Sequence, residues 1–135
     1  MNVGQYRCYN GEGEMEVGNR IAVVGSRSFR NYAQLCSALD SILYRGDSIV
    51  SGGAIGADSM AQRYAKDRGF RIDIIYPDYA HYGRGAAFIR NKEIVEHSDR
   101  VLAFYAKGKY QQGGTANTAE WARKLGKALE EYEEV

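Results

Sequence analysis

Short apolar runs alternate with amphipathic segments along most of the chain. Buried strands are predicted where apolar residues are continuous and bounded by glycine, proline or polar residues. Four runs have this character: RIAVVG (20–25), SIVSGG (48–53), FRIDIIYP (70–77) and RVLAFYA (100–106). Between and after these runs, apolar side chains recur three or four positions apart, which predicts helices. The chain is therefore expected to form strand–helix units in regular succession.

Particular residues mark the ends of the predicted helices. Asn31 is a predicted N-cap, and Gln34 stands three residues later as its capping-box partner. Gly69 and Gly126 are placed to end later helices, since glycine is the usual residue after a helix. Helices are predicted around Tyr32–Leu43, around Met60–Ala65, over 84–97 and over 115–125.

Strand–helix units in succession favour an α/β fold. Right-handed crossovers would place helices on both faces of the sheet. We predict a Rossmann-like three-layer sandwich over residues 20–135, with a mostly parallel sheet of four to five strands. The fifth strand is open: the tail KALEEYEEV (127–135) favours helix by propensity, whereas Gly126 before it favours a break and a short strand.

The first nineteen residues do not follow the alternation. This stretch, 1–19, is polar and contains YNGEGE, whose Asn-Gly pair is typical of a tight hairpin turn. Residues 5–9 and 14–17 are weak candidates for its two strands. An N-terminal hairpin and an unstructured leader both remain open.

Composition narrows the choice of function. The 135 residues suit one domain, and 18 basic against 17 acidic residues give a net charge of +1. Strong non-specific binding to nucleic acid normally needs a basic excess, so the balance disfavours it. No apolar run approaches the ~20 residues of a membrane helix and no signal peptide is recognisable, so a soluble, cytoplasmic protein without a membrane partner is expected.

The metal-ligating residue types do not form a metal pattern. Cys8 and Cys36 fit no metal spacing, and His81 and His97 are separated by a predicted helix. Cys36 falls on the apolar face of its helix, so we expect a buried free thiol. Neither a metal nor a cofactor is predicted.

The loops after the four strands carry the candidate chemistry. They read GSRSF (25–29), SGGAIGAD (51–58), YPDYAHYGRG (76–85) and AKGKYQQGGTANT (106–118). In an open α/β sheet these loops meet at the carboxyl edge, where ligands bind. Glycine-rich turns before helices expose backbone N–H groups to anions, and Arg27, Arg84 and Arg90 could add charge-assisted hydrogen bonds. Neither the dinucleotide fingerprint nor the P-loop pattern is present.

Four segments in this order resemble one superfamily. VVGSRSF, IVSGGAIGAD, YGRGAAFIRN and GGTANTAEWA are similar to motifs of the SLOG superfamily. That superfamily joins the Rossmann domain of DNA-processing protein A, the Lonely Guy enzymes and small YpsA-like proteins, and the resemblance is greatest to the short stand-alone YpsA-related members. It implies a Rossmann-like fold and a nucleotide or nucleotide-derived ligand.

The resemblance also implies site residues, taken motif by motif. The positions that match are Gly25, Ser26, Arg27, Ser51, Gly52, Gly53, Gly56, Asp58, Arg90, Asn91, Gly113, Gly114, Thr115 and Thr118. The glycines of SGGAIGAD are expected both to make the turn and to open the backbone to a ligand. Asp58 is expected either to cap its helix or to contact a ribose hydroxyl. Tyr76, Tyr79 and Tyr82 are expected either to stack on a base or to pack on the sheet edge.

Position 118 separates the candidate functions. Lonely Guy hydrolases read P-G-G-x-G-T-x-x-E, and the glutamate helps to cleave an N-glycosidic bond, whereas this chain has Thr118 at that place. Glu120 should face away, since two residues turn a helix by about 200°. We therefore predict a nucleotide-binding or nucleotide-sensing protein, with phosphoribohydrolase activity and DNA-processing-protein-like DNA binding as alternatives. Family members commonly pair through helices, so a homo-oligomer is expected, with Trp121 as a candidate core or dimer residue.

Overall fold

The computed structural model describes residues 7–9 and 15–135. The elements in chain order are β1 (Arg7–Tyr9), β2 (Met15–Val17), β3 (Arg20–Gly25), α1 (Tyr32–Ile42), β4 (Ser48–Ser51), α2 (Ala57–Arg68), β5 (Arg71–Ile74), α3 (Tyr79–Tyr82), the 3₁₀ helix η1 (Gly83–Gly85), α4 (Ala86–Glu96), β6 (Arg100–Tyr105), α5 (Gly113–Lys124) and β7 (Ala128–Glu133).

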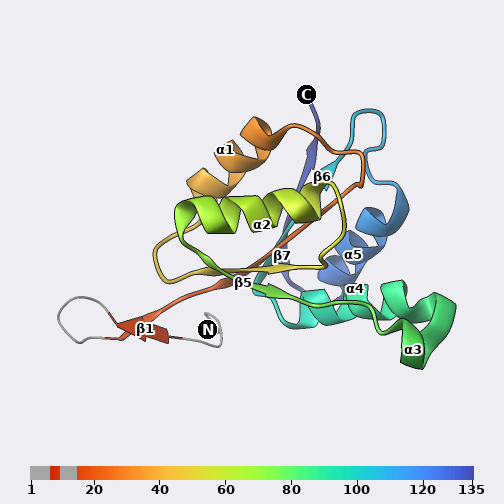
Figure 1. Ribbon diagram of the computed structural model, residues 1–135, viewed down its shortest axis with the longest axis horizontal. Helices are drawn as coiled ribbons and strands as arrows, with labels where there is room; N and C mark the ends of the chain where they lie inside the picture. Colours follow the sequence, from red (N-terminus) through yellow and green to blue (C-terminus); the bar gives the residue numbers. More distant parts are fainter. Residues whose placement is uncertain (1–6, 10–14) are drawn as a thin grey trace.

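Five strands form one parallel sheet in the order β5-β4-β3-β6-β7. The chain moves outward from β3 through β4 to β5, then returns past β3 to β6 and β7. Helices α1 and α2 cover one face of the sheet, and α4 and α5 cover the other (Figure 1). The predicted α/β, Rossmann-like three-layer fold is confirmed. Its topological switch point lies between β3 and β6, where an open α/β sheet forms a ligand crevice.

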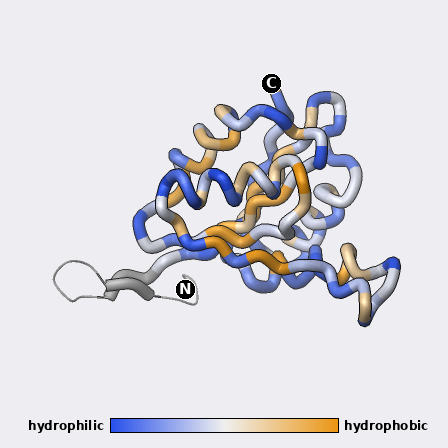
Figure 2. Tube along the Cα trace, viewed as in Figure 1, coloured by the Kyte–Doolittle hydropathy of each residue, from blue (hydrophilic) through white to orange (hydrophobic). Residues whose placement is uncertain are grey.

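The two cores follow from the period of two along the central strands. Ile21 and Val23 of β3 pack under α1 and α2, whereas Ala22 and Val24 pack under α4 and α5. β6 alternates in the same way, and hydrophobic residues gather along these central strands (Figure 2). Because both faces are covered, these strands are apolar throughout, as the sequence indicated.

Two predicted helix ends are confirmed. The Asn31 side chain accepts a hydrogen bond from the backbone N–H of Gln34 at 3.0 Å, and α2 ends at Gly69. Cys36 on α1 is free and packs against the core, but it is half-buried rather than fully buried.

The tail after Gly126 is a strand. β7 pairs in parallel with β6, and the Tyr132 ring stacks on Phe104 with 4.9 Å between centroids. The strand alternative was therefore right and helical propensity was misleading, because a free sheet edge offered the segment backbone partners.

The segment after β5 differs from the prediction. It was expected to be a loop followed by a helix from residue 84, but it contains α3 and η1, and α4 begins at Ala86. Asp78 starts α3 by accepting a hydrogen bond from the backbone N–H of His81 at 3.0 Å. The Asx-type cap at Asp78 is the signal that the sequence reading missed.

At the N-terminal end, β1 and β2 pair antiparallel in a separate two-stranded sheet. The predicted Asn-Gly turn, with the start of its first strand, lies outside the described residues. Across residues 7–9 and 15–135, the helices are all too short or too polar to cross a membrane.

Candidate functional site

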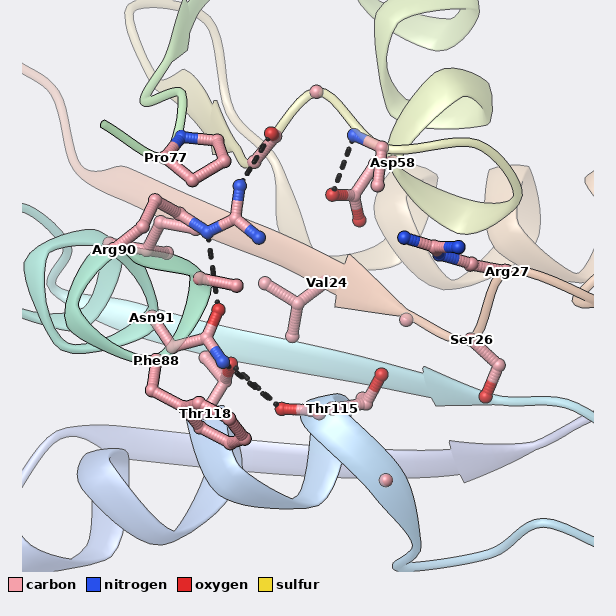
Figure 3. A pocket seen from close by; sticks show the side chains of 18 of the residues that line it. Val24, Ser26, Arg27, Asp58, Pro77, Phe88, Arg90, Asn91, Thr115 and Thr118 are labelled. Carbon is pink, nitrogen blue, oxygen red and sulfur yellow. Dashed lines mark hydrogen bonds between the residues drawn. The ribbon is translucent and has the colours of Figure 1, made fainter. Parts of the chain in front are cut away.

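A cavity of about 690 Å³ lies where the loops after β3, β4, β5 and β6 converge. Residues from α3, α4 and α5 complete its wall, so it occupies the crevice at the switch point (Figure 3). Its volume falls within the range of roughly 300–1,000 Å³ that is usual for small-molecule sites.

The cavity brings together twelve of the fourteen site residues expected from the sequence. They are Gly25, Ser26, Arg27, Gly52, Gly53, Asp58, Arg90, Asn91, Gly113, Gly114, Thr115 and Thr118. Ser51 and Gly56 do not line it, and neither does Arg84. Ser51 is fully buried, and its hydroxyl oxygen accepts a hydrogen bond from the backbone N–H of Gly53 at 3.3 Å, so it shapes the loop from below.

Asp58 places a buried carboxylate among backbone amides. Its Oδ2 accepts a hydrogen bond from Ala54 N–H at 3.2 Å, and the N–H groups of Gly52 and Gly25 also face the carboxylate. Burial raises the pKa of Asp58 to about 6, although the Ala54 N–H and the nearby Arg90 guanidinium oppose the rise. The expected helix cap is wrong, because the N-cap of α2 is Gly56 and Asp58 lies within the first turn of the helix. The carboxylate instead satisfies the donors of the preceding loop.

Arg90 and Asn91 on α4 connect three loops. Arg90 donates from Nη1 to the carbonyl oxygen of Gly52 at 2.7 Å, and its Nε donates to Oδ1 of Asn91 at 3.2 Å. Asn91 in turn donates from Nδ2 to Oδ1 of Asn117 at 3.1 Å and to the carbonyl oxygen of Gly114 at 3.5 Å. These residues line the cavity, and most of their polar side-chain atoms already form hydrogen bonds within the chain.

Packing alone accounts for two of the predicted glycines. A Cβ on Gly25 would lie 2.4 Å from the Cβ of Ala57 and 2.5 Å from the carbonyl oxygen of Phe104. A Cβ on Gly56 would lie 2.4 Å from the carbonyl oxygen of Ser26. Both distances are far below van der Waals contact. These glycines allow the start of α2 to pack against β3 and its loop.

The same holds for the two glycines that follow β4. A Cβ on Gly52 would lie 2.8 Å from Nη1 of Arg90. Gly53 has a φ of 74°, and a Cβ there would lie 2.8 Å from the Tyr76 ring. The glycines of SGGAIGAD are therefore explained by the turn and its packing, and the expected opening of this backbone to a ligand is not needed to explain them.

Gly113 and Gly114 are different. No atom lies within 4 Å of the Cβ position of either residue. Gly113 needs glycine for its φ of 73°, but the backbone of Gly114 has no such requirement. Both residues line the cavity at the start of α5, whose N-cap, Gln112, makes no side-chain capping bond. The start of α5 thus combines open space at two Cβ positions with amides that its N-cap side chain leaves uncapped.

The charges that line the cavity are mostly positive. Arg27, Arg90 and Lys109 line it, and Asp58 is the one acid among the described lining residues. Arg27 and Lys109 are exposed, and neither forms an ion pair with a carboxylate in residues 7–9 and 15–135. Two cations without a carboxylate partner among the described residues, in a cavity that also contains the start of α5, favour an anionic ligand.

The opposite end of the cavity combines apolar and polar side chains, since Arg90 and Asn91 lie between Pro77 and Phe88 (Figure 3). Pro77 and Phe88 lie at one end, and Ser26 and Arg27 lie at the other (Figure 3). Tyr76 and Tyr79 also line the cavity, whereas Tyr82 does not. The sequence reading missed Phe88, Lys109 and Gln112. Their signal was position, since each lies within four residues of a predicted site residue at the same sheet edge.

Thr118 and Glu120 fit no hydrolytic arrangement. The buried Thr118 hydroxyl donates to the carbonyl oxygen of Gly114 at 3.2 Å, so its proton is already used within the chain. Glu120 lies on the exposed side of α5, 3.9 Å from Nζ of Lys124. Within the described part of the chain, no cluster of three or more His, Cys, Asp or Glu residues is placed to hold a metal ion.

Three comparisons bear on this site. The model of a family described as YspA, cpYpsA-related SLOG matches residues 19–82. The gene 61 protein of Mycobacterium phage D29 is 30% identical over 115 residues, a match that covers 79% of this chain and 90% of the phage protein.

The structure is also similar to that of DNA processing protein A from Helicobacter pylori, which binds single-stranded DNA. The TM-score is 0.63 at 23% identity, with 84% of this chain covered. This chain spans 64% of the length of that solved chain, and the similarity is one of fold.

Proposed function

The chain belongs to the YspA, cpYpsA-related family of the SLOG superfamily, and on that premise we propose that its cavity binds a nucleotide or a nucleotide-derived molecule. The proposed role is binding or sensing. The observation that carries it is the open space around Gly113 and Gly114 at the uncapped start of α5, inside a cavity with two unpaired cations.

The phosphate of the ligand is assigned to α5 and not to SGGAIGAD. The amides of the latter loop already surround the carboxylate of Asp58, which occupies the place of an anion. At α5 the helix dipole and free N–H groups favour a phosphate, and Gly114 lets it approach the backbone. Arg27 and Lys109 supply positive charge from the loops after β3 and β6.

The other end of the cavity suits a base. Tyr76, Tyr79 and Phe88 offer aromatic surface there, and Pro77 adds apolar surface. A ligand with a phosphate at one end and a planar ring at the other matches this polarity. Hydrolysis of the ligand is disfavoured, since Thr118 replaces the glutamate of the hydrolases.

A substitution at Gly114 tests the proposal. Gly114→Ala meets no steric conflict, and alanine favours a helix by up to about 1 kcal/mol, so the free protein should fold and keep its stability. The added methyl group would stand where the phosphate approaches. We expect AMP affinity, measured by titration calorimetry, to fall at least about tenfold, or 1.4 kcal/mol.

Gly85→Ala is the matched control. Gly85 precedes α4, has open space around its Cβ position and does not line the cavity. AMP affinity should be unchanged in this variant. If single-stranded oligonucleotides bind the wild type and nucleotides do not, the proposed small-molecule role is wrong and DNA binding takes its place.

A further inference from the structure

The end of the cavity around Pro77 and Phe88 holds few free groups that could identify a base. Asn91 and Gln112 are the two side-chain amides among the described residues that line the cavity. Gln112 belongs to the turn before α5, at the proposed phosphate end. Both functional atoms of Asn91 are engaged within the chain, by Arg90, Asn117 and Gly114.

Two backbone donors near the aromatic residues are also engaged. Gly53 N–H donates to the hydroxyl oxygen of Ser51, and Ala54 N–H donates to Asp58. Pro77 has no N–H group. Nη1 of Arg90 donates to the carbonyl oxygens of Gly52 and Ile75.

The most exposed side chains at this end are aromatic. Tyr76 is 66% exposed, and Tyr79 and Phe88 are each 58% exposed. The tyrosine hydroxyls rotate and serve as donor or acceptor, so they complement different base edges equally. Every base has a flat face for stacking, and stacking tolerates changes of sequence.

We propose that the cavity holds the base of its ligand by stacking on Phe88 and the two tyrosines and does not read the hydrogen-bonding edge. This inference rests on the proposed nucleotide-binding function and deepens it. The ligand class is then nucleotides in general, selected by phosphate and ring. Sites built to hydrogen-bond a substrate group reject analogues by ~10⁴-fold or more, whereas apolar pockets discriminate by ~10–200-fold.

Competition between three probes tests this inference on the full chain. AMP and GMP should have dissociation constants within about tenfold of each other, as expected of an apolar pocket. Ribose 5-phosphate lacks the base and should bind about 5- to 150-fold more weakly than AMP, the equivalent of ~1–3 kcal/mol for one stacked base.

Phe88→Ala should weaken AMP and GMP by similar factors and leave ribose 5-phosphate unchanged. The control is Ile89→Ala, since Ile89 is exposed on the same helix and does not line the cavity. A preference of more than about 200-fold for AMP or for GMP exceeds what an apolar pocket provides and overturns the inference while leaving the proposed function standing. An equal loss for all three probes in Phe88→Ala also overturns it. If none of the three binds the wild type, both proposals are wrong.

Discussion

Arg90 of α4 donates a hydrogen bond from Nη1 to the carbonyl oxygen of Gly52, 2.7 Å away at the end of β4. The same nitrogen reaches the carbonyl oxygen of Ile75, and Nε holds Asn91. Arg90, which the sequence suggests as a ligand-binding residue, therefore also holds together the loops that form the cavity. Because Gly52 is buried, its carbonyl oxygen would have no water to replace the guanidinium.

Arg90→Ala should therefore lower both the stability of the free protein and its affinity for nucleotide. Leaving a buried acceptor without its charged donor costs about 1–3 kcal/mol, measurable as a shift in the urea unfolding midpoint. Arg90→Lys retains a cation that reaches Gly52 but lacks the planar group that also holds Asn91, so it should recover part of the loss. Unchanged stability with lost binding would instead make Arg90 a ligand group alone.

Asp58→Asn should change how stability depends on pH. The pKa of Asp58 is about 6 when folded and near 3.8 when unfolded, so the folded state binds the proton more tightly. The contribution of Asp58 to stability is present below pH 4 and is lost as pH rises through 6. Asparagine stays neutral, so the variant should gain up to about 3 kcal/mol relative to wild type between pH 4 and 7.5 in denaturant titrations.

Asp40→Asn is the control of opposite sign. A hydrogen bond from the Tyr64 hydroxyl, together with Arg68, holds the pKa of Asp40 below its usual value. Its contribution to stability is present above the unfolded pKa and is lost as pH falls. The loss of folding stability in Asp40→Asn relative to wild type should therefore be largest near neutral pH. The same pH trend in both variants would contradict the buried carboxylate at Asp58.

Glu134→Ala should loosen two loops of the cavity at once. One Glu134 oxygen accepts a hydrogen bond from Arg30 N–H at 2.9 Å, and the other accepts from Lys107 N–H at 3.3 Å. These amides belong to the loops that carry Arg27 and Lys109. Hydrogen exchange of both amides should become faster, and nucleotide affinity should fall by a few-fold. Glu120→Ala, on the far side of α5, should alter neither measurement.

No free base should be released from nucleoside monophosphates. Cleavage of the N-glycosidic bond builds positive charge on the sugar and needs an activated water, tasks for which a threonine hydroxyl is a poor group. Thr118 holds the position, and its proton is bound by Gly114. Chromatography after long incubation of AMP with the protein should detect no adenine. If the wild type produces adenine and Asp58→Asn does not, the hydrolase hypothesis is supported and the binding role is contradicted.

The sequence by itself determined the fold class, because local patterns reflect the environment of each segment. Continuous apolar strands such as RIAVVG indicate burial on both faces, and the Asn31 cap needs only the backbone three residues ahead of it. The order of strand–helix units then restricted the topology, and the loops at the carboxyl edge pointed to the cavity.

Only the tertiary structure decided which glycine turn has open space beside it. SGGAIGAD and the turn at Gly113 look alike in sequence, since both are small residues before a helix. The folded structure separates them: the carboxylate of Asp58 accepts a hydrogen bond from an amide of its own loop, while the space around Gly114 stays empty. β7 was likewise decided by the free edge of β6, because a strand depends on a partner that its own sequence does not contain.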